Sequence, residues 1–198
     1  MEQHLPPLGA ITDDLVLRAK AGDRSAYDQL FARVAARLGL YVRARLGPGL
    51  RGRLEPEDVL QEVYLEAHRS FAGFEARGER AFMRWLCGIA EHRLRDLSDR
   101  FSARKRAAPG PAAPSSALAA LPGSGPGPST ACDGARSQAR LLEALQALTA
   151  EERDAILLRY VRDLTLREVA SELGRSEPTV RRVLARALVR LGEALSGG

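Results

Sequence analysis

A long segment poor in charge and rich in Pro, Gly, Ala and Ser limits what this chain can fold into. It covers residues 102–137 and reads "SARKRAAPGPAAPSSALAALPGSGPGPSTACDGARS". A segment of this composition buries too little apolar surface to offset the entropy of ordering it, so it predicts a flexible linker. The flanking units are each the size of a small domain. We therefore expect a domain over 1–101, a linker over 102–137 and a domain over 138–198.

Both units have the apolar spacing of helices, and neither has the alternating Val, Ile and Thr runs or the hairpin dipeptides of a sheet. The predicted fold class is all-α, with two small helical domains. We expect helices at 12–21, 24–46, 55–71 and 79–100, and then at 136–147, 151–161, 165–173 and 177–194. Asp23 is the expected N-cap of the second helix, and Thr149 with Glu152 has the spacing of a capping box.

The composition is that of an ordinary protein with a modest basic excess. Thirty Lys and Arg against 25 Asp and Glu give a net charge of +5, which permits a polyanionic partner without requiring one. No run of about 18 apolar residues and no signal peptide is visible, so we expect a cytoplasmic protein without membrane contact. The two Cys and three His lack metal-site spacing, and no catalytic motif is present. We therefore predict no enzyme activity, no metal and no cofactor.

The stretch "TLREVASELGRSEPTVRRVLARAL", Thr165–Leu188, has the pattern of a helix-turn-helix. Such a pair needs a small residue in its first helix, Gly at the turn and apolar inner faces. Ala170 and Gly174 meet the first two needs. The predicted inner faces contain Leu166, Val169, Leu173, Val180, Val183, Leu184, Ala187, Leu188 and Leu191. An ordinary helical hairpin shares this periodicity, but the arginines on the second helix favour DNA binding.

The first turns of that second helix would enter the major groove, where Arg and polar side chains reach base edges and phosphates. The predicted DNA-contacting residues are Glu177, Pro178, Thr179, Arg181, Arg182, Ala185 and Arg186. Arg190 lies further along and is better placed for solvent or a phosphate.

Leu141–Leu195 resembles region 4 of bacterial sigma factors of the extracytoplasmic-function (ECF) type. The stretches "DLVLRAKAGDRSAYDQLFARV" and "EPEDVLQEVYLEAHRSFAGFEARGERAFMRWLCGIAEHRLRDL" resemble region 2 of the same family. The resemblance implies that the C-terminal unit binds the promoter −35 element and that the N-terminal unit binds core RNA polymerase and the −10 element. Since no region corresponds to the additional domains of larger sigma factors, we expect a member of the minimal two-domain group.

The third predicted helix is locally acidic, with no Lys or Arg between Glu55 and His68. Val59, Leu60, Val63, Tyr64 and Ala67 form its expected core face. The residues directed elsewhere include Asp58, Gln61, Glu62 and Leu65. An outward Leu among acids suggests a basic partner surface with an apolar centre, whereas a solvated acidic face is the alternative. The resemblance implies that this partner is the β′ coiled coil of the polymerase, with Asp58, Gln61, Glu62 and Leu65 at the contact.

The fourth predicted helix is basic, and Phe82, Trp85, Leu86, Ile89, Leu94 and Leu97 are its expected buried stripe. This leaves Arg80, Arg84, His92, Arg95 and Asp96 outside. The resemblance implies that they bind the −10 element, although the family often has Asn where His92 stands. Phe71 and Phe74 precede this helix and are either walls of a pocket for an unstacked base or core residues.

The expected function is therefore that of a promoter-specificity subunit, monomeric when free. Its expected partners are core RNA polymerase, through the β′ coiled coil and the β flap, and promoter DNA. An anti-sigma factor is an optional further partner. One alternative is a dimeric helix-turn-helix regulator with an N-terminal helical sensing domain. Another is a helical adaptor or anti-sigma-like module that does not bind DNA.

Overall fold

The computed structural model describes residues 8–46, 53–75, 81–107 and 128–196, and every regular element among them is helical. The N-terminal unit contains α1 (Leu8–Lys20), α2 (Arg24–Arg45), α3 (Pro56–Ser70), a short 3-10 turn (Phe71–Gly73) and α4 (Ala81–Ala107). The C-terminal unit contains α5 (Pro128–Ala147), α6 (Ala150–Ile156), a π-helical turn (Leu157–Val161), α7 (Leu166–Leu173) and α8 (Glu177–Ser196). The all-α prediction is confirmed for the described residues.

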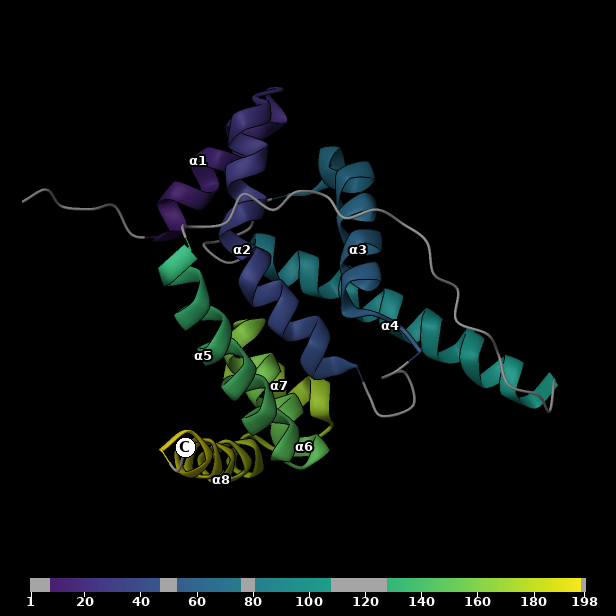
Figure 1. The fold of residues 1–198 in the computed structure, drawn as a ribbon, viewed down its shortest axis with the longest axis vertical. Coiled ribbons are helices and arrows are strands. Elements are labelled where there is room, and N and C mark those ends of the chain that lie inside the picture. The colour runs from purple at the N-terminus through teal and green to yellow at the C-terminus, as the bar shows by residue number, and fades with distance from the viewer. Residues whose placement is uncertain (1–7, 47–52, 76–80, 108–127, 197–198) are drawn as a thin grey trace, which may run out of the picture.

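In the N-terminal unit, α2 packs against α1, α3 and α4, and α3 packs against α4 (Figure 1). The N-cap of α2 is Asp23, whose Oδ1 accepts a hydrogen bond from the Ala26 N–H at 3.0 Å. The core side chains of this unit include Leu30, Leu38 and Tyr41 of α2 and Leu86 of α4, all fully buried. Tyr41 Oη donates to Glu91 Oε1 at 2.5 Å, so its phenol is paired inside the core.

In the C-terminal unit, α8 packs against α5, α6 and α7. Two capping boxes begin α6 and α7: Thr149 with Glu152, as predicted, and Thr165 with Glu168. Gly174 ends α7 with φ of 60°, a left-handed conformation that favours Gly and allows the sharp turn into α8. The chain therefore forms a helix-turn-helix from Thr165 onward.

The observed helices extend beyond several predicted ends. The first helix begins at Leu8 rather than at 12, α4 continues to Ala107 and α5 begins at Pro128. Both ends of the segment 102–137 are therefore helical, and its central part, 108–127, lies outside the described residues. The Ala, Arg and Lys residues at the end of α4 are good helix formers, which explains its extension, whereas the Ser, Thr, Asp and Gly residues at the start of α5 are not, and local propensity does not explain that start.

The two units contact each other mainly through α2. This helix packs against α5 and against the π-helical turn that follows α6. In Figure 1, α5 lies beside α2, whereas α8 lies on the side of the C-terminal unit away from α2. One of the predicted site residues, Arg84, lies at the contact between the units.

Candidate functional site

The helix α8 presents the predicted DNA-contacting residues on its outer face. Its inner face buries Val180, Val183, Leu184, Ala187 and Leu191, as predicted. Pro178, Arg181, Arg182, Ala185 and Arg186 are exposed, and Glu177 and Thr179 are half-buried. Leu188 was predicted on the inner face but is 45% exposed, because it lies at the edge of the apolar stripe whose centre buries Ala187 and Leu191.

Side-chain pairs order the first turns of α8. Arg181 pairs with Glu177 at 3.6 Å, and Arg182 Nη2 donates to Thr179 Oγ1 at 3.4 Å. A shallow hollow on this face is lined by Thr179, Arg182, Val183, Ala185 and Arg186. The helix thus offers two exposed guanidinium groups beside a surface of small side chains, a combination suited to base edges and phosphates.

Glu152 is a buried carboxylate beneath α8 that the sequence had marked only as a cap. Its Oε2 accepts hydrogen bonds from Thr149 N at 3.2 Å, Thr149 Oγ1 at 2.9 Å and Arg190 Nη1 at 2.8 Å. Arg186 Nε lies 3.9 Å from Glu152 Oε1. Burial acts to raise the pKa of Glu152, but the bonds from Thr149 and the charges of Arg190 and Arg186 outweigh it and lower the pKa. Arg190 is therefore an anchor of α8 rather than a freely solvated arginine.

The acidic helix α3 has the two faces expected from its sequence. Val59, Val63 and Ala67 are buried, and Leu60 and Tyr64 are partly buried. On the other face, Asp58 and Glu62 are exposed, Gln61 is half-buried and Leu65 is 50% exposed. Pro56 starts the helix, and Glu57 and Asp58 stand in its first turn, where the helix dipole favours negative charge. An exposed leucine thus stands among carboxylates on one helix face.

The basic helix α4 buries Phe82, Leu86 and Leu94, with Trp85, Ile89 and Leu97 partly buried beside them. Phe71 and Phe74 are 7% and 5% exposed. Phe74 lies 4.8 Å from Trp85 and 5.6 Å from Phe82 between ring centroids. These contacts make Phe71 and Phe74 core residues, so of the two interpretations of this pair the structure favours the packing one.

The predicted −10 residues on α4 lie in different surroundings. His92 has a side chain 72% exposed and pairs with Asp96 at 3.2 Å, one turn further along. Arg95 is exposed on the same helix. Arg80 lies outside the described residues. Arg84 was expected to be available on the outside, but its guanidinium contacts the C-terminal unit instead.

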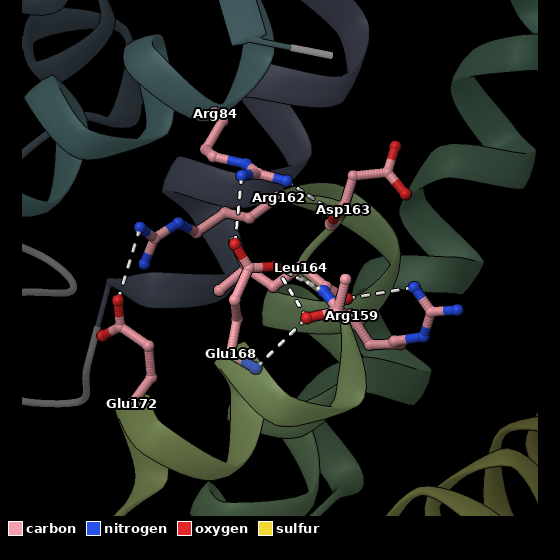
Figure 2. A network of polar contacts seen from close by, with 8 residues as sticks. Arg84, Arg159, Arg162, Asp163, Leu164, Glu168 and Glu172 are labelled. Atoms are coloured by element: carbon pink, nitrogen blue, oxygen red, sulfur yellow. Dashed lines mark hydrogen bonds and ion pairs between the residues drawn. The ribbon is translucent and has the colours of Figure 1, made fainter. Parts of the chain in front are cut away.

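Arg84 reaches two acceptors at the start of the helix-turn-helix (Figure 2). Its Nη1 donates to Glu168 Oε1 at 3.2 Å and its Nη2 to the Asp163 carbonyl at 3.2 Å. Glu168 in turn caps α7 through Thr165. The pKa of Glu168 is lowered, first by the Thr165 N–H bond and then by the Thr165 hydroxyl and the charges of Arg84 and Arg162. Arg84 therefore links the predicted −10 surface to the predicted −35 unit.

Two arginines of α2 also donate hydrogen bonds to the C-terminal unit. Sequence patterns did not indicate these contacts. Arg45 Nη1 donates to Asp154 Oδ1 of α6 at 2.5 Å. Arg37 Nη2 donates to the carbonyls of Tyr160 and Val161 at 3.1 and 3.2 Å. These pairs join residues more than 100 positions apart. No local periodicity encodes such a contact.

The described residues contain no group of three or more His, Cys, Asp and Glu side chains arranged to hold a metal ion. Cys87 is buried in α4, and burial raises the pKa of its thiol to about 12. None of the described helices combines the length and the apolar character needed to cross a membrane.

Comparisons with known proteins agree with this geometry. Residues 144–193 match the family model "Sigma-70, region 4", which includes α7 and most of α8. The chain is 34% identical over 187 residues to the ECF RNA polymerase sigma factor SigD of Mycobacterium tuberculosis, covering 94% of this chain and 85% of SigD. It is 30% identical to the RNA polymerase sigma factor CarQ of Myxococcus xanthus, covering 90% of this chain and 94% of CarQ.

Two solved structures are similar in fold. One is CnrH in complex with the cytosolic domain of CnrY, with a TM-score of 0.50 and 22% identity, covering 94% of this chain and 98% of CnrH. The other is the sigma factor RpoE in complex with the anti-sigma factor NepR from Bartonella quintana, with a TM-score of 0.50 and 20% identity, covering 86% and 96%. At these identities the similarity concerns the fold alone.

A helix-turn-helix with exposed arginines, joined to a helical unit with an acidic outer helix, defines a DNA-binding transcription protein of the sigma class. Given its identity to SigD over most of both chains, the protein belongs to the ECF sigma factors of RNA polymerase. Members of this family are promoter-specificity subunits without enzymatic activity of their own.

Proposed function

We propose that this protein binds core RNA polymerase through the outer face of α3 and directs it to promoters through α4 and α8. The observation that carries the proposal is the helix-turn-helix itself. The stretch that matches sigma region 4 buries Val180, Val183 and Leu184 and directs Arg181, Arg182 and Arg186 outward. Transcription takes place where the polymerase is, so we infer that the protein acts in the cytoplasm.

The proposed −35 contacts are Glu177, Pro178, Thr179, Arg181, Arg182, Ala185 and Arg186. Arg182 and Arg186 are the best candidates for base recognition, because both line the hollow on the outer face of α8. A guanidinium can bond the O6 and N7 atoms of a guanine together. Arg186 is further oriented by the Glu152 carboxylate beneath it.

The proposed −10 contacts are Arg80, Arg84, His92, Arg95 and Asp96. His92 and Asp96 form an exposed pair on α4, and Arg95 lies between them in sequence. An imidazole oriented by a carboxylate can donate or accept a hydrogen bond at a base edge. This proposal requires the Arg84 guanidinium to be accessible to DNA.

The proposed polymerase contact comprises Asp58, Gln61, Glu62 and Leu65. An apolar side chain surrounded by carboxylates suits a basic partner with an apolar centre, which the family resemblance assigns to the β′ coiled coil. The β flap is the proposed partner of the C-terminal unit, and an anti-sigma factor is a further proposed partner. The dimeric-regulator alternative is not favoured by the family membership, and gel filtration of the protein alone should give a monomer.

The proposal is tested by purifying the protein with core polymerase and mapping transcription starts in vitro. Replacing both Arg182 and Arg186 by Ala should weaken promoter-specific binding by about 1 to 3 kcal/mol for each guanine that an arginine no longer binds. Binding to core polymerase should be unchanged. Arg136→Ala is the matched control, because it removes an exposed arginine of α5, in the same unit and outside α8. Unchanged transcription by the double variant from a mapped promoter would refute the assignment.

A further inference from the structure

The hollow on the outer face of α8 has an apolar floor bordered by two arginines. Its volume is about 490 Å³, and its lining consists of Thr179, Arg182, Val183, Ala185 and Arg186. Ala185 is exposed, so its methyl group faces solvent between the arginines, whereas Val183 is buried beneath it. The hollow therefore combines hydrogen-bond donors at its sides with short apolar side chains at its floor.

Both bordering arginines are held by contacts within the protein. Arg182 Nη2 donates to Thr179 Oγ1 at 3.4 Å, and Arg186 Nε lies 3.9 Å from the buried carboxylate of Glu152. Each contact uses one nitrogen of a guanidinium group, which leaves its other N–H groups to donate to a ligand. The two guanidinium groups are thus oriented in advance, and the floor at Ala185 stays open.

An apolar floor of this kind distinguishes between the bases of a duplex. In the major groove, thymine presents a C5 methyl group beside its O4 acceptor, whereas guanine, adenine and cytosine present polar groups there. A methyl group against Ala185 leaves water without losing a hydrogen bond, and that burial is favourable. A polar group at the same place would lose its bonds to water, because the alanine side chain offers it no partner.

The spacing along α8 allows the arginines and Ala185 to meet neighbouring base pairs. Arg182 and Arg186 are four residues apart, which is about 6 Å along the helix axis. Successive base pairs are about 3.4 Å apart, so the two arginines reach base pairs that are about two steps apart. Ala185 lies between them along the axis. The base pair that it meets therefore lies between or beside those that the arginines bind.

We propose that the hollow at Ala185 is a subsite for the C5 methyl group of a thymine in the −35 element. The neighbouring base pairs contain the guanines that Arg182 and Arg186 bind. This subsite rests on the proposed function of α8 in −35 binding. Ala185 then contributes to specificity through apolar contact, whereas the arginines contribute through hydrogen bonds.

Replacing thymine by uracil tests the subsite, because uracil lacks only the C5 methyl group. The probe is a promoter duplex mapped with this protein, bound by the protein together with core polymerase, in which each thymine is replaced in turn. Burial of one methyl group corresponds to about fourfold in affinity. We expect uracil at one position of the −35 element to weaken binding about fourfold, and uracil at thymines outside both promoter elements to leave binding unchanged.

A substitution in the protein assigns the effect to Ala185. Ala185→Gly removes the methyl group that forms the floor, so the thymine and uracil duplexes should bind equally well. Ala194→Gly is the matched control, because it makes the same change at another exposed alanine of α8, outside the hollow, and it should keep the fourfold preference. Glycine weakens any helix, but the ratio of the two affinities within one variant does not depend on that cost. Circular dichroism should show the same helix content for both variants.

The outcomes separate the subsite from the proposed function. Equal affinity of the wild type for thymine and uracil at every −35 position would overturn the subsite, as would a mapped −35 element without thymine. A preference that Ala185→Gly retains in full would overturn it too. In these cases specific binding to the promoter duplex still supports the proposed function. If the wild type binds the promoter no better than an unrelated duplex, the proposed function itself fails, and the subsite fails with it.

Discussion

Glu152 illustrates how one carboxylate can orient a DNA-binding helix. It is 3% exposed, it closes the capping box of α6 and it accepts a bond from Arg190 of α8. The same side chain lies 3.9 Å from Arg186, a proposed −35 contact. A residue with no proposed contact to DNA therefore ties the start of α6 to the arginines of α8.

We predict that Glu152→Ala lowers the free energy of unfolding by about 1 to 3 kcal/mol, because the side-chain half of the capping box is removed and Thr149 and Arg190 are left without their acceptor. Chemical denaturation followed by circular dichroism measures this. Glu151→Ala is the control, since its pair with Arg175 is partly exposed and contributes about 1 kcal/mol or less. Equal decreases for the two variants would contradict the role given to Glu152.

The pH dependence of stability should reflect the titration of three carboxylates that cap helices. The pKa of Asp23 is lowered, mainly by the Ala26 N–H bond, and the pKa values of Glu152 and Glu168 are lowered as well. A carboxylate whose pKa is lower in the folded state contributes stability that is complete above its unfolded pKa, about 4. That stability is lost as the pH falls through the lower folded pKa.

We therefore expect the melting temperature to change little between about pH 6 and 8 on account of these groups, and to fall steeply below about pH 4. Glu152→Gln should flatten this acid limb, since one of the titrating groups is gone. Thermal melts across the pH range measure both effects. An acid limb of the same steepness in Glu152→Gln would show that Glu152 titrates alike in the folded and unfolded states.

At the scale of the helix, α3 separates the sigma interpretation from a merely solvated acidic surface. The helix buries Val59, Val63 and Ala67 and leaves Leu65 50% exposed. Leu65 makes no contribution to the buried core. Its exposure thus has a physical explanation if a partner covers it, because an apolar side chain at the centre of an interface is desolvated on binding.

We predict that Leu65→Ala combined with Glu62→Lys weakens binding to core polymerase by about 2 to 5 kcal/mol, because the interface buries less apolar surface and places like charges opposite each other. Helix content and melting temperature should change little, because neither side chain is buried. Co-migration with core polymerase on gel filtration measures the effect. Glu57→Lys, a similar charge change at an exposed position of the same helix, is the control.

If the double variant binds core polymerase normally, the outer face of α3 is only a solvated acidic surface. A drop in helix content would instead show that the core of α3 includes the opposite side.

At the scale of the whole molecule, sequence patterns were informative where one element determines its own structure. The inner face of α8, the turn at Gly174 and the cap at Asp23 follow from local spacing and were predicted. Leu188 was misplaced, because it lies at the edge of the apolar stripe, where the neighbouring helices and not the spacing decide burial. The contact of Arg84 with Glu168 was also missed, since it joins residues 84 positions apart in two separate units.

The roles of the site residues could be predicted only through the family resemblance. Exposed arginines, a histidine next to Asp96 and an outward leucine indicate binding surfaces, but the residues alone do not identify their partners. The contact between the two units could not be predicted in this way. It depends on donors in α2 and α4 meeting carbonyls at a π-helical turn, and the sequence contains no regular pattern for such a turn.

The length of chain between the two units limits how far apart they can bind. Helix α4 ends at Ala107 and α5 begins at Pro128, so residues 108–127 connect them. Twenty residues at about 3.3 to 3.6 Å each extend to about 70 Å at most. Two turns of duplex between the promoter elements also span about 70 Å. The connection is therefore long enough for both elements, but with less slack than a linker over all of 102–137 would have.

Deleting ten residues from 108–127 halves this reach to about 35 Å. We expect the shortened protein to bind a −35 duplex or a −10 oligonucleotide as the full chain does, but to lose the combined footprint on a promoter with both elements. Replacing 108–127 by Gly and Ser at the original length is the control and should be tolerated, because only length is required. Footprinting with core polymerase measures both. If the deletion keeps both footprints, the bodies of the two units supply the span and the connecting length is not limiting; if the Gly/Ser chain loses one, the native residues 108–127 make a contact of their own.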